Sequence, residues 1–120
     1  MEPQHLPDEK SQLFTPYRLG GVTLRNRTIR SAAFESMGRD FSPTEQLKQY
    51  HVSVARGGIG MTTLAYAAVC RSGLSFRKQL WLREAIVPQL ATITDAVHKE
   101  GAAASIQIGH CGNMTPVSYT

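Results

Sequence analysis

The sequence predicts an α/β fold in which parallel strands are joined by helices. Three runs of small and apolar residues, 28–34, 59–65 and 102–108, have the length and character of buried strands. Two segments between them repeat apolar residues with the period of a helix that covers a sheet. Connections of helix length exclude simple hairpins, so these strands should run parallel. A doubly wound sheet and a (β/α)8 barrel both contain this order of elements.

Length and composition limit the classes of protein. The chain has 120 residues, of which 42% are hydrophobic, so it is not disordered by composition, but it is shorter than a complete barrel of about 250 residues. No apolar run approaches the roughly 20 residues of a membrane span, and we expect no membrane partner. Residues 1–12 lack the features of a signal peptide, which predicts a flexible leader and a cytoplasmic protein.

Charge and cysteine content give weaker guidance. The net charge of +4 comes with no recognition helix or aromatic RNA-binding motif, so we expect no nucleic-acid partner. Cys70 and Cys111 are far apart and form no C-x-x-C pair, which predicts reduced, unreactive thiols. His110 next to Cys111 lacks the further ligands of a metal site, and no metal is expected.

The first elements are a hairpin and a strand. Two β-rich runs, 17–19 and 22–24, flank Gly20 and Gly21, which accept the positive φ of a tight hairpin turn. The run 28–34 then predicts the first main strand.

The first helix should begin near Ser42. Ser42 can cap it, Pro43 has no donor to lose at the first helical position, and Glu45 completes a capping box. Arg56 suits the negative end of the helix, and Gly57 ends it. The apolar positions at helical spacing are Leu47, Tyr50 or His51, and Val54. The histidines His51 and His98 are expected on helix surfaces.

The second half repeats the strand–helix unit. After the strand 59–65, an irregular connection over 66–83 is expected, with Trp81 packed beneath it. The second helix should begin between residues 84 and 87, because Pro88 is tolerated only in a first turn. Lys99 and Gly101 end this helix, whose apolar stripe is Ile86, Leu90, Ile93 and Val97.

The third strand ends in a cluster of polar side chains. Gln107 and His110 follow the small apolar run 102–106 and stand near glycines. Polar groups at the carboxyl end of a parallel strand lie where α/β folds bind their ligands. This stretch therefore predicts the rim of a binding site.

Several motifs, taken together and in order, resemble the amino-terminal third of the Old Yellow Enzyme family of NADH:flavin oxidoreductases. The motifs are Leu13-Phe14-Thr15-Pro16, Leu24-Arg25-Asn26-Arg27, Gly57-Gly58-Ile59-Gly60, Asp95-Ala96-Val97-His98-Lys99-Glu100-Gly101 and Gln107-Ile108-Gly109-His110-Cys111-Gly112. The resemblance implies a domain over residues 13–120 that forms the first three β/α units of a TIM (β/α)8 barrel, an incomplete barrel with an amino-terminal β-hairpin. It also implies FMN as cofactor and NAD(P)H as reductant.

The resemblance implies flavin contacts at five positions. Ala33, Phe34 and Glu35 match the segment that lines the flavin after the first strand, and Tyr66 matches the residue after the second. Gln107 matches the glutamine that hydrogen-bonds the isoalloxazine edge, where an amide offers both a donor and an acceptor.

The chain departs from the family pattern at four of its positions. In the family, proline is usual at the position of Ala33, and threonine or cysteine at the position of Glu35. A small residue is usual at the position of Tyr66, and arginine at that of Asn113. A carboxylate at position 35 would disfavour an anionic reduced flavin unless it is protonated or turned away.

No catalytic residue is assigned within residues 1–120. The resemblance implies that the substrate-orienting pair, the catalytic tyrosine and the flavin phosphate site come from later strands. We therefore expect a truncated piece, inactive alone, of an enzyme that reduces the activated C=C bond of an enone-type small molecule. The alternative is a non-catalytic αβ module that pairs with another chain, or with itself, through open sheet edges.

Overall fold

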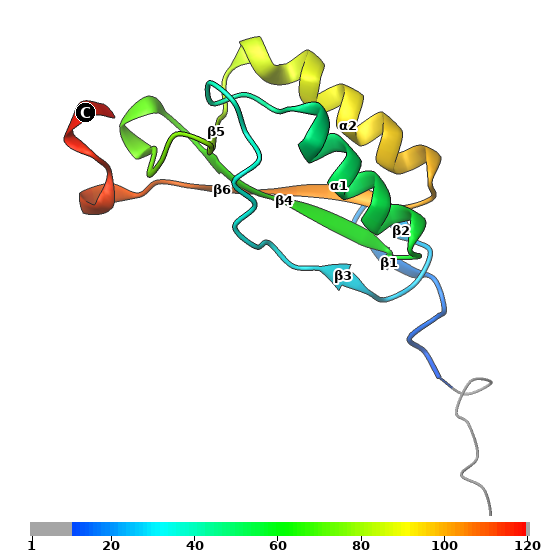
Figure 1. The fold of residues 1–120 in the computed structure, drawn as a ribbon. Helices are drawn as coiled ribbons and strands as arrows, with labels where there is room; N and C mark the ends of the chain where they lie inside the picture. Colours follow the sequence, from blue (N-terminus) through cyan, green and yellow to red (C-terminus); the bar gives the residue numbers. More distant parts are fainter. Residues whose placement is uncertain (1–10, 120) are drawn as a thin grey trace, which may run out of the picture.

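Three parallel strands form the centre of the structure, a computed structural model that describes residues 11–119 (Figure 1). Strand β4 (Met61–Ala68) lies between β3 (Ile29–Arg30) and β6 (Ala103–Gly109) and pairs in parallel with both. The predicted parallel arrangement is confirmed. Residues 1–10 of the predicted leader lie outside the described residues.

The strand bounds differ from those predicted. Strand β3 is much shorter than the predicted 28–34, because the chain leaves the sheet after Arg30. Strand β4 continues to Ala68, so Tyr66 lies within it and not after it. The two-residue strand β5 (Leu80–Trp81), which pairs with the end of β4, was not predicted. Two residues are too few for a periodic pattern.

The expected hairpin is present at the amino-terminal end of the sheet. Strands β1 (Tyr17–Leu19) and β2 (Val22–Leu24) pair antiparallel around Gly20, whose φ of 60° requires the conformational freedom of glycine. Leu24 is buried, and Figure 1 shows the hairpin at the end of the molecule opposite the carboxyl terminus.

Helix α1 (Glu45–Arg56) begins two residues later than a cap at Ser42 would place it. The N-cap is Thr44, whose Oγ1 accepts a hydrogen bond from the backbone N–H of Leu47 at 3.1 Å. The prediction of Ser42 was wrong because Ser42 exchanges backbone hydrogen bonds with Arg39 in a tight turn. The predicted helix end at Arg56 and Gly57 is confirmed.

Both helices cover the same face of the sheet (Figure 1). Helix α2 (Val87–Lys99) follows a 3-10 turn over Glu84–Ile86 and holds its proline in the first turn, as predicted. Further 3-10 turns span Arg71–Gly73, Gly112–Met114 and Val117–Tyr119. Among the helices of residues 11–119, none is long and apolar enough to cross a membrane.

The core lies between the helices and the sheet. The predicted apolar stripe is confirmed, since Ile93 and Val97 of α2 and Ile86 of the preceding 3-10 turn are buried, and Leu90 packs against the main core cluster. On α1 the inward positions include Val52 and Ala55, whereas the predicted Val54 is only half-buried. The main cluster comprises Leu47, Ala55, Leu64, Ala67, Leu80, Ile93, Val97 and Ala102.

Arg25 joins the hairpin to the carboxyl ends of both helices. Its guanidinium donates hydrogen bonds to the carbonyl of Ala55 at 2.5 Å and to that of Glu100 at 2.7 Å. It also donates to the carbonyl of Ile59, which leads into β4. A cation here satisfies carbonyls that have no partner within the helices and complements their negative ends.

We predict that Arg25→Ala lowers the free energy of unfolding by about 2–3 kcal/mol, because several charge-assisted hydrogen bonds are lost at once. Urea unfolding of the purified chain measures the change. Arg27→Ala is the matched control, because Arg27 is exposed and its guanidinium only lies over the Tyr17 ring. Equal effects of the two substitutions would contradict the role given to Arg25.

Candidate functional site

The carboxyl ends of the parallel strands bring the predicted site residues to one edge of the sheet. Ile106 and Ile108 of β6 pair with Leu64 and Ala67 of β4, so Gln107 lies opposite the irregularity in β4 that contains Tyr66. The segment after β3 reaches the same place, because Glu35 accepts a hydrogen bond from the backbone of Ala65. The three segments that carry the predicted site residues therefore meet at one edge of the sheet.

Gln107 points to the face of the sheet that the helices leave uncovered. Its neighbour Ile106 packs into the core beneath the helices, and successive side chains of a strand alternate between faces. Gln107 is exposed, and its amide has no hydrogen-bond partner among residues 11–119. A free donor and a free acceptor thus stand together at the rim.

Phe34 and Ala33 are exposed on the segment that follows β3. Phe34 is 63% exposed, and its ring lies 4.2 Å, centroid to centroid, from the ring of Phe76. This pair presents apolar aromatic surface near the carboxyl end of the sheet.

Tyr66 is committed to contacts within the protein. Its hydroxyl lies 2.6 Å from Oγ of Ser75 and 4.0 Å from Sγ of Cys111. Ser75 in turn donates to the side-chain oxygen of the buried Gln79 at 2.9 Å. Tyr66 therefore ties the end of β4 to the connection that follows it.

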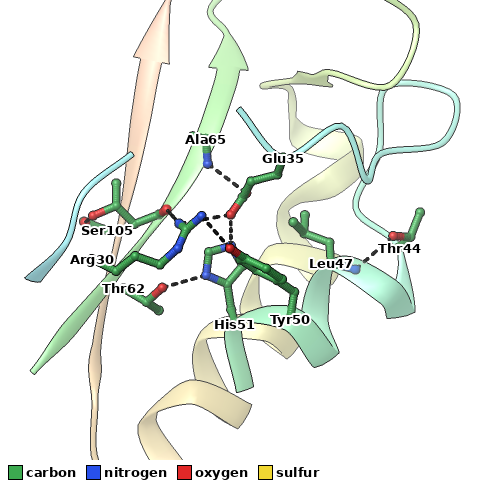
Figure 2. A network of polar contacts seen from close by, with 10 residues as sticks. Arg30, Glu35, Thr44, Leu47, Tyr50, His51, Thr62, Ala65 and Ser105 are labelled. Atoms are coloured by element: carbon green, nitrogen blue, oxygen red, sulfur yellow. Dashed lines mark hydrogen bonds and ion pairs between the residues drawn. The ribbon is translucent and has the colours of Figure 1, made fainter. Parts of the chain in front are cut away.

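Glu35 is turned into the protein, as Figure 2 shows. Its side chain is 3% exposed, and one carboxylate oxygen accepts a hydrogen bond from the backbone N–H of Ala65 at 3.0 Å. The other oxygen lies 3.1 Å from the guanidinium of Arg30 and 2.7 Å from Nε2 of His51. The carboxylate is thus turned away from the rim and is held by a cation and an imidazole.

His51 is fully buried, and its predicted place on the helix surface is wrong. It stands four residues after Leu47, on the face of α1 that packs against the sheet, and its Nδ1 lies 2.7 Å from Oγ1 of Thr62. The position of His51 on the apolar stripe was a signal in the sequence. The polar Thr62 within a strand buried beneath the helix was the second signal.

Arg30 completes the network and also binds two neighbours outside it. Its guanidinium donates to the carbonyl of Thr63 and to the hydroxyl of Tyr50, both at 2.9 Å. The hydroxyl of Thr63 lies 2.8 Å from that of Ser105, which extends the contacts to β6. Sequence reasoning assigned Arg30 no role, because its partners come from three separate elements.

The remaining polar candidates form no metal site. The exposed His110 accepts a hydrogen bond at Nδ1 from the backbone N–H of Gly112 at 2.9 Å. Cys70 and Cys111 are free thiols. In the part of the chain that the structure describes, no group of three His, Cys, Asp or Glu residues could hold a metal ion.

Comparison with known proteins gives matches over nearly the whole chain. Residues 12–120 match the NADH:flavin oxidoreductase / NADH oxidase family. The chain is 47% identical over 100 residues to the 4,4'-dithiodibutanoate disulfide reductase of Rhodococcus erythropolis, covering 83% of this chain and 25% of that protein. It is 44% identical over 105 residues to a probable N-methylproline demethylase of Rhizobium meliloti (strain 1021), covering 86% and 16% respectively.

A solved structure from the same group of enzymes has a similar fold. The old yellow enzyme homologue from Zymomonas mobilis superposes with a TM-score of 0.78 at 29% identity, over 88% of this chain and 30% of that one. The chain spans a quarter or less of the length of the two curated relatives.

We predict that Glu35→Ala lowers the free energy of unfolding by about 3 kcal/mol or more, because it leaves Arg30 without its buried counter-charge. Glu35→Gln should cost less, since the amide oxygen can still accept from Ala65. Chemical unfolding measures both. Glu84→Ala is the control, because Glu84 is exposed and its carboxylate forms no hydrogen bond or ion pair among the described residues. A Glu35→Ala protein as stable as the control would show that the network contributes nothing.

Proposed function

Because the chain belongs to the NADH:flavin oxidoreductase / NADH oxidase family, we propose that it is part of an FMN-dependent oxidoreductase that uses NAD(P)H as reductant. In this proposal the parallel strands are the first three units of a (β/α)8 barrel, and the β1–β2 hairpin lies at its amino-terminal end. The likeness to the Zymomonas mobilis structure supports the proposal, and so does the cover of helices on one face only.

The free amide of Gln107 at the rim is the observation that carries the proposal. The flavin edge presents imide-like groups that need one donor and one acceptor, and Gln107 offers both without a competing partner among the described residues. Exposed Phe34 and Ala33 supply apolar surface beside it. These residues fit a flavin. When bound, FMN supplies the hydride chemistry, and the protein binds and orients it.

Glu35 and Tyr66 would contribute to the flavin site through their backbone and not through their side chains. The carboxylate of Glu35 is engaged by Arg30 and His51, and the hydroxyl of Tyr66 by Ser75. A carboxylate held away from the rim adds no repulsion to an anionic reduced flavin, which removes the conflict that its sequence position raised.

We further propose that the complete enzyme reduces activated C=C bonds of enone-type small molecules. One relative, 30% identical over 102 residues, is a multifunctional alkene reductase/demethylase of Caballeronia cordobensis. The relatives reported above are named for the reduction of a disulfide and the demethylation of an N-methyl compound, so the alkene has to be tested against other substrates. An NAD(P)H oxidation assay with 2-cyclohexenone and with a disulfide as alternative acceptors tests this choice. An N-methylamine would be oxidised and not reduced, so it is assayed separately, without NAD(P)H, by the formaldehyde released.

The prediction concerns a chimera in which residues 12–113 of this chain replace the matching region of the Rhodococcus erythropolis enzyme. We predict that this chimera retains FMN through gel filtration. In that chimera Gln107→Leu should weaken FMN binding about tenfold, because two hydrogen bonds of roughly 0.5–1.5 kcal/mol each are lost. Flavin absorbance and fluorescence titration measure both. Gln89→Leu is the matched control, because Gln89 is an exposed amide on α2.

A chimera that folds without flavin, while the parent enzyme binds it, would instead favour a non-catalytic αβ module. The polypeptide of residues 1–120 alone should hold FMN weakly or not at all. A ligand that binds loses translational and rotational freedom, which costs several kcal/mol of free energy. The hydrogen bonds of one amide contribute too little to offset this cost. Stoichiometric flavin on that polypeptide would show that the flavin site is contained within it.

A further inference from the structure

A half-open cavity of about 1030 Å³ lies beside the amino-terminal end of α1 and has no part in the proposed flavin contacts. Its walls come from the loop over residues 36–41, from the first turn of α1 and from the connection before β5, where Arg77 and Lys78 stand. Tyr119 lines it from the last 3-10 turn. A cavity of this size accommodates a small organic molecule.

The two loops that form the cavity are held in direct contact. The backbone N–H of Gly38 donates to the carbonyl of Lys78 at 2.9 Å. A Cβ at position 38 would lie 2.5 Å from that carbonyl oxygen, so only glycine permits this approach. The contact at Gly38 thereby brings Arg39 on one loop and Arg77 and Lys78 on the other into the walls of one cavity.

The loop over residues 36–41 is fixed before any ligand binds. The guanidinium of Arg83 donates to the carbonyl of Phe41 at 3.0 Å, and the backbone N–H of Trp81 donates to the same carbonyl at 2.9 Å. Ser36, Asp40 and Phe41 have positive φ values of 55°, 50° and 59°, a backbone conformation that residues other than glycine rarely adopt. A loop held in this way presents its side chains in a set arrangement, which lowers the entropy lost on binding.

The cavity carries cations that the protein leaves unpaired. Arg39, Arg77 and Lys78 are exposed, and none forms an ion pair or side-chain hydrogen bond within residues 11–119. Asp40 and Glu45 also line the cavity, so three cations face two carboxylates there. The carboxylate of Glu45 is partly engaged by the side-chain amide of Gln49 at 2.9 Å. The positive end of the α1 dipole adds to the excess of positive charge.

Apolar groups line the same cavity. The rings of Phe41 and Tyr119 pack edge to face with centroids 5.4 Å apart, and Met37 lies on the same loop as Phe41. A ligand that used the whole cavity would therefore combine an anionic group with an apolar body.

We propose that this cavity binds an organic anion, either a carboxylate or a phosphate ester, with its charged group among Arg39, Arg77 and Lys78. Its apolar body would pack against Met37 and the Phe41–Tyr119 ring pair. The cavity begins one residue after Glu35 on the segment that carries Phe34 to the rim. Assigning this anion as the substrate of the flavin enzyme rests on the proposed function, but the binding itself does not.

Calorimetric titration of the flavin-free chain at low ionic strength tests the proposal. The probes are benzoate, phenyl phosphate, inorganic phosphate and the uncharged benzyl alcohol. We expect benzoate or phenyl phosphate to bind and benzyl alcohol not to bind. Whichever of the two anions binds more tightly shows whether the natural ligand is a carboxylate or a phosphate ester. Arg39→Gln and Lys78→Gln should each weaken binding about three- to fivefold, an effect that high salt reduces.

The matched controls are Arg18→Gln and Lys99→Gln, which remove one charge each from exposed positions outside the cavity. Arg39→Lys and Lys78→Arg keep the charge and should retain most of the affinity, and circular dichroism checks that every variant is folded. The proposal is overturned if neither organic anion binds at millimolar concentration, or if the cavity variants match the controls. Inorganic phosphate that binds as well as phenyl phosphate would overturn the apolar subsite. Loss of flavin from the chimera changes none of these outcomes.

Discussion

The buried carboxylate of Glu35 is the constraint on which the carboxyl-terminal edge of the sheet depends. A charge removed from water is costly unless it is paired and hydrogen-bonded, and Arg30, His51 and the backbone of Ala65 together meet that demand. These partners belong to β3, α1 and β4, so one side chain joins three elements (Figure 2). It also explains why β3 is short: the chain must leave the sheet soon after Arg30 to bring Glu35 beneath the helix.

The two ends of the sheet are built for different purposes. At the amino-terminal end, Arg25 binds carbonyls at the ends of both helices, and the β1–β2 hairpin covers the strands. At the carboxyl-terminal end, Gln107 and Phe34 are exposed. Parallel α/β folds place ligands at this second end and stabilising contacts at the first. The free amide of Gln107 lies at the ligand end and the carbonyls bound by Arg25 lie at the other, while the paired Glu35 network supports the ligand end from within.

Sequence reasoning succeeded where the determining interactions are local. The end of α1 at Gly57, the proline in the first turn of α2 and the parallel strands follow from nearby residues and connection lengths. It failed for the cap at Thr44, because Ser42 is engaged in a turn with Arg39. It also failed for His51, because its partners lie on β4 and on the segment after β3. Gln107 reached its expected place at the rim, and its contact with flavin stays a prediction.

The segment between β3 and α1 explains why sequence position alone could not give the role of each side chain. Three fixed points define its path: Glu35 bound to Ala65, Gly38 bound to Lys78, and Thr44 at the helix cap. Phe34, next to the first point, is exposed near the rim, and Arg39, next to the second, lines the cavity. The rim and the cavity are both positioned by these three contacts. Removal of the Glu35 carboxylate should therefore disturb the rim and the cavity together. Gln107 forms no hydrogen bond with this segment among the described residues, so a substitution of Gln107 should affect the rim alone.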